Sequence, residues 1–471
     1  MDWAETEMKG INLGDKRLND RTASLLGRLA EAPDASIPQA CQGWAEVKAA
    51  YRFFDNAAAK PELLLAPHRA ATQERMRQES VVLLLNDTTE LDYTSKPATT
   101  GLGPLSYSEQ NGGYLHPLLA VTPERLCLGV LSAQWLVRDP ETHGQSKATK
   151  KQRPIEEKES HRWPVAFAEV CAMAKELPDT RLVYVADRES DIHELLAAAQ
   201  GAPADLLIRS NQNRALVGGG FLHDTVDADP ALGQMTVSLP AVPGRPQRNA
   251  VLTLRSLIVT LRPPYRPGGQ IDAVAITVVR AREEKPPKGQ EPIDWILLTN
   301  RTVSTGQDAQ TLVEWYVCRW VVEIFFRILK TGCAVESLQL GDVTRLKNAI
   351  TLYLIVAWRI LFVVSCGRAC PNVSCEAIFS ENEWRTAYRV VNRQPPPSKP
   401  PTLQIMIRLI STLGGFLDRT GDGEPGPQTM WLGLRRIHDF AFALDAIAEI
   451  EAKTKAKRAK SKRKPKGRIC G

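Results

Sequence analysis

The 471-residue chain has few of the features that mark secreted, disulfide-bonded or membrane-spanning proteins. Its nine cysteines show no paired spacing, and the one cluster, Cys366, Cys370 and Cys375, lacks a nearby fourth Cys or His to complete a zinc site. Reduced structural thiols are the favoured interpretation, and a zinc site is the alternative. No charged start followed by an apolar stretch and a cleavage site appears at the N-terminus, so we expect no secretion signal.

Long uninterrupted hydrophobic runs are also missing. The longest apolar run, from Ala349 to Cys366, contains Arg359, which favours a buried helix over a membrane span. The content of 43% hydrophobic and 24% charged residues is ordinary for a folded protein, and the length allows roughly two to four domains. We therefore expect a cytoplasmic protein with a substantial core.

Acidic residues are absent from one end of the chain, and this absence explains the net charge of +7. The segment from Lys453 to Arg468 holds ten Lys or Arg residues, and without them the rest of the chain is slightly acidic. We predict that residues 453–471 form a disordered basic tail. Such a tail either adds salt-sensitive affinity for phosphates or is merely solvated. Any nucleic-acid binding by the folded body must then use local basic patches.

Residues 1–70 are predicted to be helical. The segments "LGDKRLNDRTASLLGRLAEA" and "GWAEVKAAYRFFDN" show amphipathic patterns, and the first is basic. One interpretation is a small DNA-binding module, with contacts from Lys16, Arg17, Arg21 and Arg52. The alternative is a helical cap that packs on the next domain.

The next part of the chain, residues 71–370, is predicted to be an α/β domain. From residue 81 the order is three strands, helix, strand, helix, strand, which indicates a mixed sheet with helices on its faces. Alternating segments punctuated by Pro and Gly predict a strand-rich insertion at about 213–305. A C-terminal helical region is expected over 371–452, around the Pro-rich break "QPPPSKPP".

Two carboxylates occupy equivalent places in this pattern. Asp87 closes the apolar strand "VVLLLND", and Asp187 closes "RLVYVAD". Ligands collect at strand ends in sheets covered by helices, although an Asp after a strand also commonly forms a turn or caps a helix. If the sheet is of the ribonuclease H type, the first and fourth strands lie near one another and bring the two acids together.

The segment "VEWYVCRWVVEIFFRILKTG" is an apolar helix with one polar stripe. Its five polar side chains project within an arc of roughly 80° at 100° per residue; they are Tyr316, Arg319, Glu323, Arg327 and Lys330. Glu323 would supply a third carboxylate beside Asp87 and Asp187. Clustered carboxylates without soft ligands suit Mg²⁺ or Mn²⁺, and two such ions would support phosphoryl transfer. The neighbouring hydroxyl and cations suit a phosphodiester backbone.

The stripe also contains the signature Tyr-x2-Arg-x3-Glu-x6-Lys, formed by Tyr316, Arg319, Glu323 and Lys330. With it, the chain resembles the DDE transposases of the fourth insertion-sequence family. The similarity covers most of the chain and includes "LGDKR", "AYRFF", "NDTTELDY" around Asp87, "ADRESDIH" around Asp187, "LIRS", "PPKGQEPIDWILLT" and "LGGFLDR". The basic tail after Ile450 has no counterpart in the family member used for comparison, and the N-terminal domain matches in short stretches only, so the recognised DNA sequence does not carry over.

The resemblance implies a ribonuclease H-like catalytic core interrupted by the β insertion. It also implies an N-terminal domain that binds transposon-end DNA and a C-terminal region that pairs two subunits. Asp87, Asp187 and Glu323 correspond to the catalytic, metal-binding triad. The implied DNA contacts near cleavage are Tyr316, Arg319, Lys330, Arg209, Arg188 and Trp295, on which a flipped base stacks. Trp295 is otherwise a core residue, and Arg188, Glu189 and Asp191 otherwise open the next helix.

The implied function is cut-and-paste DNA transposition, with metal-dependent nicking at the transposon ends and transfer of the 3′ hydroxyl into target DNA. The expected cofactor is Mg²⁺ or Mn²⁺, two ions per site, and the partners are double-stranded DNA and a second copy of the chain. The resemblance places the protein in the bacterial cytoplasm, on the nucleoid when bound to DNA. The alternatives are a catalytically silent or regulatory protein that occupies transposon ends, and a nuclease that cuts without joining.

Overall fold

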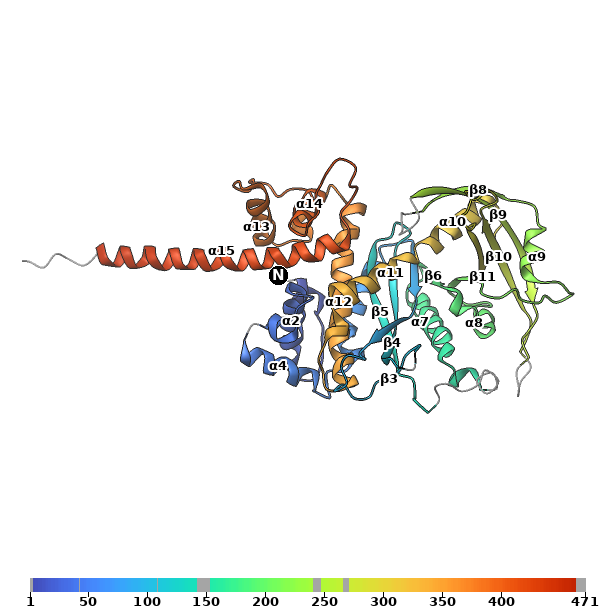
Figure 1. Ribbon diagram of the computed structural model, residues 1–471, viewed down its shortest axis with the longest axis horizontal. Coiled ribbons are helices and arrows are strands. Elements are labelled where there is room, and N and C mark those ends of the chain that lie inside the picture. The colour runs from blue at the N-terminus through green and yellow to red at the C-terminus, as the bar shows by residue number, and fades with distance from the viewer. Residues whose placement is uncertain are drawn as a thin grey trace, which may run out of the picture.

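A computed structural model describes residues 3–41, 43–107, 109–141, 153–239, 247–265 and 271–462 of the chain. One twisted sheet occupies one half of the molecule, and helices from both ends of the chain occupy the other half (Figure 1). The predicted mixed α/β architecture with flanking helices is therefore confirmed.

Five strands form the centre of the sheet. They are β1 (Val81–Asn86), β4 (Asn111–Val121), β5 (Cys127–Leu136), β6 (Arg181–Ala186) and β7 (Asp205–Arg209). Their order across the sheet is β5-β4-β1-β6-β7, in which β1, β6 and β7 are parallel and β4 runs antiparallel to both β1 and β5. The continuous apolar sequences of β1 and β6 suit these positions because both faces of each strand are buried.

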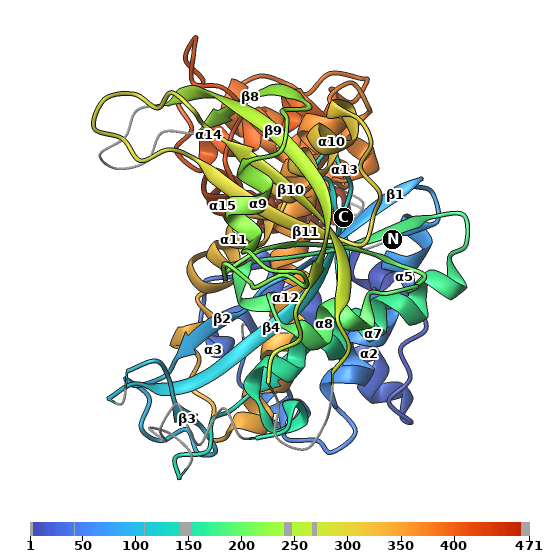
Figure 2. The same cartoon turned by 90° about the vertical axis from the view of Figure 1, so that its right-hand side faces the viewer.

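The remaining strands extend this sheet. Two short strands, β2 (Thr89–Asp92) and β3 (Gly103–Pro104), pair with β4. Beyond β7 the order continues as β11 (Asp294–Thr299), β10 (Val274–Arg282), β9 (Arg248–Leu261) and β8 (Gly233–Leu239), all antiparallel. The predicted strand-rich segment therefore joins the central sheet edge to edge (Figure 2).

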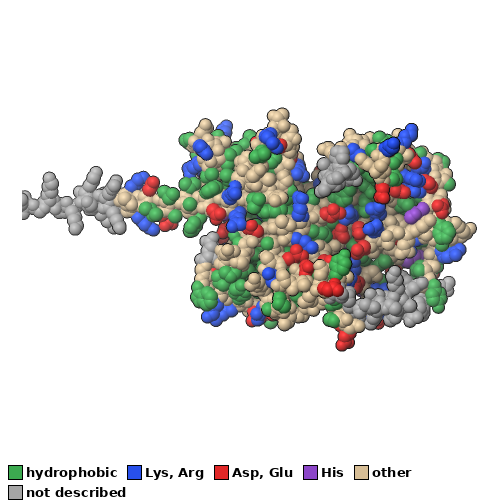
Figure 3. Space-filling view, in the orientation of Figure 1, with side chains coloured by type: hydrophobic (Ala, Val, Ile, Leu, Met, Phe, Trp, Pro, Cys, Tyr) green, Lys and Arg blue, Asp and Glu red, His purple; other side chains and the backbone are tan. Residues whose placement is uncertain are grey.

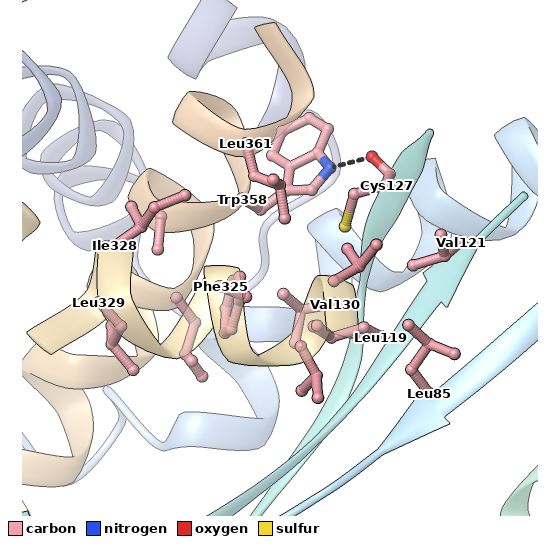
Figure 4. Close-up of a cluster of buried hydrophobic side chains, with 14 of the residues drawn as sticks. Leu85, Leu119, Val121, Cys127, Val130, Phe325, Ile328, Leu329, Trp358 and Leu361 are labelled. Atoms are coloured by element: carbon pink, nitrogen blue, oxygen red, sulfur yellow. Dashed lines mark hydrogen bonds between the residues drawn. The ribbon is translucent and has the colours of Figure 1, made fainter. Parts of the chain in front are cut away.

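Helices cover the two faces of the central strands differently. One face packs against α7 (Arg162–Glu176) and α8 (His193–Ala198), through residues of β1 and β6 such as Leu84 and Tyr184. The opposite face packs against α10 (Gly306–Val317), α11 (Trp320–Arg327) and α12 (Val343–Ala369). Figure 4 shows Phe325 of α11 and Trp358 of α12 above Leu85 and Leu119, with the Trp358 indole donating to the Cys127 carbonyl at 3.0 Å.

The N-terminal residues are helical, as predicted. The helices are α1 (Trp3–Glu7), α2 (Lys16–Glu31), α3 (Ile37–Cys41), α4 (Trp44–Phe54) and α5 (Pro61–Met76). Asp15 caps α2 by accepting from the backbone N–H of Arg17 at 2.8 Å. Short helical turns elsewhere are η1 (Ile155–Glu157), η2 (Glu159–His161), η5 (Val335–Ser337) and η6 (Cys375–Ala377), and α9 (Leu222–Asp227) packs on β9 and β10.

Helix α12 is apolar and long enough to cross a membrane by length and composition. Within the described protein, however, 83% of its most apolar window is buried, between α5, β5 and the C-terminal helices. Its position therefore agrees with the predicted buried core helix.

The C-terminal helices are α13 (Glu381–Asn392), α14 (Leu403–Leu413) and α15 (Pro427–Lys462). Helix α15 projects from the body of the molecule, and its far half has few neighbours (Figure 1). The predicted disorder from Lys453 is wrong as far as Lys462, because α15 continues to that residue. Ala, Lys and Arg are strong helix formers, and extending an existing helix avoids the cost of nucleation. The rest of the predicted tail, 463–471, lies outside the described residues.

Candidate active site

The carboxyl ends of the three parallel strands place three predicted site residues along one edge of the sheet. Asn86 pairs with Ala186 and Ala186 pairs with Ile208, so the following residues Asp87, Asp187 and Arg209 continue the same register. Neighbouring strands are about 4.8 Å apart, which makes these three residues lateral neighbours. The expected closeness of the first and fourth strands is confirmed, because β1 and β6 are adjacent.

These residues also project toward one face. Asp87 and Asp187 have the same parity as Leu85 and Val185, which pack in the core beneath α10 and α11. Burial and the nearby Asp187 carboxylate raise the pKa of Asp87 to about 6, while the positive charge of Arg319 opposes that shift. The two aspartates thus repel each other in a partly desolvated site, which favours a bound cation.

The helix predicted over the polar stripe is broken into three pieces, and this corrects the single continuous helix. Helix α10 ends at Val317, α11 starts at Trp320, and a π-helical turn, η4 (Ile328–Gly332), follows. The N–H groups of Arg319 and Val322 donate to carbonyls three residues back, which tightens the junction. Tyr316 therefore points into the core, whereas Glu323 lies on the exposed side of α11.

Arg319 lies between two acids of the predicted triad. Its guanidinium donates to Asp87 Oδ2 at 2.7 Å and to Glu323 Oε1 at 2.7 Å. Burial lowers the pKa of this guanidinium, but the surrounding Tyr316, Asp87 and Glu323 outweigh burial and leave the pKa above its ordinary value. Arg319 thus brings Glu323 to the sheet edge that carries Asp87.

The side chains of the site offer the kind of ligand atoms that bind divalent metals. Asp87, Asp187 and Glu323 offer only hard carboxylate oxygens, which are the ligands that Mg²⁺ and Mn²⁺ prefer. Two of them already lie side by side with a raised pKa at Asp87. Among the residues that the structure describes, no three His, Cys, Asp or Glu side chains are close enough to hold a metal as they stand. The Glu323 carboxylate is linked to Asp87 through the Arg319 guanidinium.

Aromatic residues form the wall of the site next to Arg209. The Trp295 ring meets the edges of Tyr316 and Trp320, with centroids 6.2 and 6.3 Å away. Trp295 is 8% exposed, so it lies in the core of this wall and offers no open platform for a base. Arg209 donates to the Asp294 carbonyl at 3.3 Å, which ties it to the start of β11.

The other predicted DNA contacts lie in several different elements. Lys330 is in the turn η4 and pairs with Glu336 at 3.4 Å, and Arg188 is exposed in η3 (Arg188–Ser190), directly after Asp187. In the N-terminal helices, Lys16 and Arg17 are exposed in the first turn of α2, and Arg52 is exposed at the end of α4. Arg21 forms an ion pair with Glu46, which joins α2 to α4.

Sequence reasoning missed a second arginine at the site. Arg162, the first residue of α7, donates to Thr88 Oγ1 at 3.0 Å and to Glu189 Oε2 at 2.9 Å. Thr88 follows Asp87, and the Glu189 N–H donates to Asp187 at 2.9 Å. Arg162 therefore connects the two loops that carry the aspartates. No local pattern indicates this role, because the contacts join residues more than 25 positions apart.

Asp191 also has a role other than opening a helix. Its buried carboxylate accepts from Arg214 at 2.8 Å and from the backbone N–H groups of Asn211 and Gln212. It thus shapes the loop that follows β7 and Arg209. Two acids therefore lie at the carboxyl ends of parallel strands, and Arg319 links one of them to a third acid on α11.

Family models match three parts of the chain. "Transposase DNA-binding" matches residues 1–59, "Transposase DDE domain" matches residues 168–359, and "Transposase Tn5 dimerisation domain" matches residues 355–448. The chain belongs to the Tn5-like DDE transposases. The DDE match contains Asp187 and Glu323, while Asp87 precedes it. This transposase is a DNA-cleaving and strand-transfer enzyme, and its DDE domain implies dependence on a divalent metal.

Among solved structures, the transposase has similarity to one described as the "piggyBac transposase synaptic complex with hairpin DNA". The sequence identity is 9%, the alignment covers 78% of this chain and 67% of that chain, and the TM-score is 0.33. A likeness this distant carries no argument about the site, so the family assignment depends on the three sequence models.

Proposed function

We propose that the transposase performs cut-and-paste transposition at a ribonuclease H-like centre with Asp87, Asp187 and Glu323 as its triad. The observation that carries the proposal is the register of the parallel strands, which aligns Asp87 with Asp187 at one sheet edge. The strand order β5-β4-β1-β6-β7, with β4 antiparallel, is the order that such a core requires. The DNA-binding domain would then be residues 1–70, and the catalytic domain residues 71–370.

The three carboxylates would hold the metal, two Mg²⁺ or Mn²⁺ ions in our proposal. Bound there, the ions would activate the attacking oxygen and stabilise the leaving oxygen of each phosphoryl transfer. In nicking, a water oxygen bonds to phosphorus, and the 3′ oxygen of the element leaves as a hydroxyl. In strand transfer, that hydroxyl attacks a target phosphorus and displaces the target's own 3′ oxygen, so one phosphodiester forms for each that breaks.

The chain's own side chains would position the DNA backbone across this edge. Arg319 and Arg209 offer cations near the carboxylates, and Tyr316 adds a hydroxyl beside them. Lys330, which pairs with Glu336, would contact the backbone further along the same stretch. Arginine suits phosphate because its planar fork donates two parallel hydrogen bonds. Over the face of the molecule in Figure 3, basic and acidic side chains are interspersed, which favours such local contacts over one broad field.

The N-terminal helices would bind the transposon ends through exposed Lys16, Arg17 and Arg52. Arg21 would act indirectly, because its ion pair with Glu46 holds α2 against α4. Trp295 would stack on a flipped base only after the wall formed with Tyr316 and Trp320 opens. We assign the region of 371–452 to pairing of two subunits, so that each DNA-bound dimer joins two ends.

End cleavage and joining by the purified full chain test this proposal. The duplex substrate would be selected from a random-sequence pool by the chain itself and incubated with Mg²⁺ and target DNA. Asp187→Asn should abolish release and joining while DNA binding persists. The matched control is Asp179→Asn, which changes an exposed acid at the opposite end of β6. Equal loss in both variants, or full activity of Asp187→Asn, would contradict the assignment.

A further inference from the structure

The guanidinium of Arg319 occupies the position where two proposed metal ligands would meet. It contacts Asp87 and Glu323 at 2.7 Å each, and its side chain is only 13% exposed. The Asp87 side chain is 16% exposed, so the ion pair between Arg319 and Asp87 is largely shielded from water. Partial burial matters here because an ion pair away from water is far stronger than one on the surface.

A divalent ion and Arg319 would compete for the same oxygens. A bound divalent ion would take the carboxylate oxygens to which the guanidinium nitrogens now donate. Like charges so close repel in a low-dielectric site. The ion pairs of Arg319 with Asp87 and Glu323 therefore lower the affinity of the triad for metal, although they keep the acids from repelling each other.

Phosphate is the natural competitor for Arg319. Guanidinium groups bind phosphate oxygens with two parallel, charge-assisted hydrogen bonds. If a DNA phosphate pairs with Arg319, the carboxylates of Asp87 and Glu323 lose their cation while Asp187 remains beside them. The site then carries uncompensated negative charge, which is the condition under which it binds metal tightly.

We propose that Arg319 is an internal counter-cation that keeps the triad from loading metal until DNA phosphate draws it away. This inference rests on the proposed function, because it requires Asp87 and Glu323 to be metal ligands. It makes metal and DNA binding positively coupled, and coupling between two ligands must be reciprocal. A DNA-free transposase would then carry little metal.

Metal binding by the DNA-free full chain gives the sharpest test, because the proposal expects a substitution at Arg319 to increase the metal affinity. Mn²⁺ binding would be measured by electron paramagnetic resonance and calorimetry, without any activity assay. Arg319→Gln should raise the Mn²⁺ affinity by about tenfold, because removing one positive charge beside two carboxylates favours a cation. Arg319→Lys should stay close to the parent, and unchanged circular dichroism would verify folding of each variant.

The matched control is Arg327→Gln, two turns further along the same stretch and on its exposed side. That substitution removes an equal charge but should leave Mn²⁺ affinity within about twofold, because exposed charges are screened. A second experiment repeats the Mn²⁺ binding measurement in the presence of the selected duplex. DNA should raise Mn²⁺ affinity in the parent chain, and this gain should be largely lost in Arg319→Gln.

The outcomes separate this inference from the proposed function. If Asp87→Asn leaves Mn²⁺ binding of the DNA complex unchanged, the triad itself is wrong. If Asp87→Asn weakens that binding but Arg319→Gln leaves the DNA-free affinity unchanged or lower, the triad stands and the counter-cation role is wrong. A rise in Arg327→Gln equal to that in Arg319→Gln would show a general charge effect and would also overturn it.

Discussion

At the scale of single residues, Arg162 shows how the loops that bear Asp87 and Asp187 keep their spacing. Its side chain is 14% exposed, and its guanidinium lies 5.1 Å from the centre of the Trp163 ring and donates to Thr88 and Glu189. Thr88 Oγ1 also forms a hydrogen bond with His116 Nδ1 at 2.8 Å. Burial lowers the pKa of His116 to about 3, so this imidazole stays neutral. Arg162 thus joins the loop after β1 to the loop after β6, which suits a role in positioning the two aspartates.

We predict that Arg162→Gln lowers end cleavage by about 10- to 100-fold, the usual effect of losing a residue that orients metal ligands. Because the loss acts through ligand position, the Mg²⁺ concentration for half-maximal activity should rise as well. Arg162→Lys should restore part of the activity. Arg181→Gln, an exposed arginine at the far end of β6, serves as control. An unchanged Mg²⁺ requirement in Arg162→Gln would argue against a positioning role.

A second buried polar group joins the N-terminal helices to the core. The Glu7 carboxylate accepts from Arg75 at 2.9 Å and from His68, whose other ring nitrogen accepts from the Val130 N–H at 2.9 Å. His68 and Arg75 both pack on Trp358 of α12, at 4.6 Å. Burial raises the pKa of Glu7, but the hydrogen bonds from His68 and Arg75 outweigh it and lower the pKa to about 2.

The lowered pKa of Glu7 predicts that the stability of the protein depends on pH. The folded pKa of Glu7 lies below its ordinary value of 4.5, so its contribution is complete above pH 4.5 and disappears as the pH falls toward 2. Glu7→Gln should lower the free energy of unfolding by about 3 kcal/mol at pH 7. The difference from the parent should shrink steadily below pH 4.5. Urea unfolding followed by Trp fluorescence measures it, and Glu5→Gln, exposed on α1, is the control.

At the scale of elements, two helices of the C-terminal region touch through glycine. A Cβ at Gly433 of α15 would lie 2.0 Å from the Ile410 carbonyl oxygen of α14, and one at Gly414 would lie 1.8 Å from that of Thr429. Neither neighbour is a flexible side-chain end, so only a backbone shift could make room. The close approach therefore requires glycine at both positions.

Gly433→Ala should separate α14 from α15 and destabilise this region by about 1–3 kcal/mol, the usual cost of overpacking. The matched control is Gly426→Ala, which meets open space just before α15. Hydrogen exchange of α14 and α15 should rise in Gly433→Ala while the central strands keep their protection. Faster exchange throughout the sheet, or none in α14, would contradict this local effect.

The same scale shows what the sequence can and cannot predict. The apolar runs that end at Asp87 and Asp187 predict two buried strands, and their parallel pairing then brings the acids together. The basic residue Arg209 joins the same edge because β7 continues the register. These predictions succeed because strand ends are marked locally, by a change from apolar to polar residues.

Features that depend on distant contacts escape such reasoning. The break between α10 and α11, next to which Tyr316 packs against Trp295, is not revealed by any helical period. Tyr316 is buried and Glu323 is exposed, so the predicted single polar stripe is split between core and surface. Likewise, the burial of Trp295 and the pairing of Arg21 with Glu46 arise from neighbours far apart in sequence.

At the scale of the whole molecule, α15 leaves an apolar face exposed. Its exposed side chains include Phe442 (71%), Ile447 (52%) and Ile450 (64%), which project within one half of the helix circumference. The helix extends well beyond the body of the protein (Figure 1), and the dimerisation model covers it as far as residue 448. The dimerisation model suggests a second copy of this chain as the partner for this face.

We predict that the transposase dimerises on DNA ends through this face. The double substitution Phe442→Ser with Ile447→Ser should reduce dimerisation by at least about tenfold, because burying each side chain contributes about 1.5–3 kcal/mol. Surface substitutions are preferable to truncation at Thr429, which would remove the buried Met430 and Ile437. Light scattering of the DNA complex measures the stoichiometry, with Ala448→Ser and Ala452→Ser on the other side of α15 as control. Single-end nicking should survive in the double variant while paired-end joining falls. A complex of one protein and one end that still completes paired-end joining would defeat the proposal.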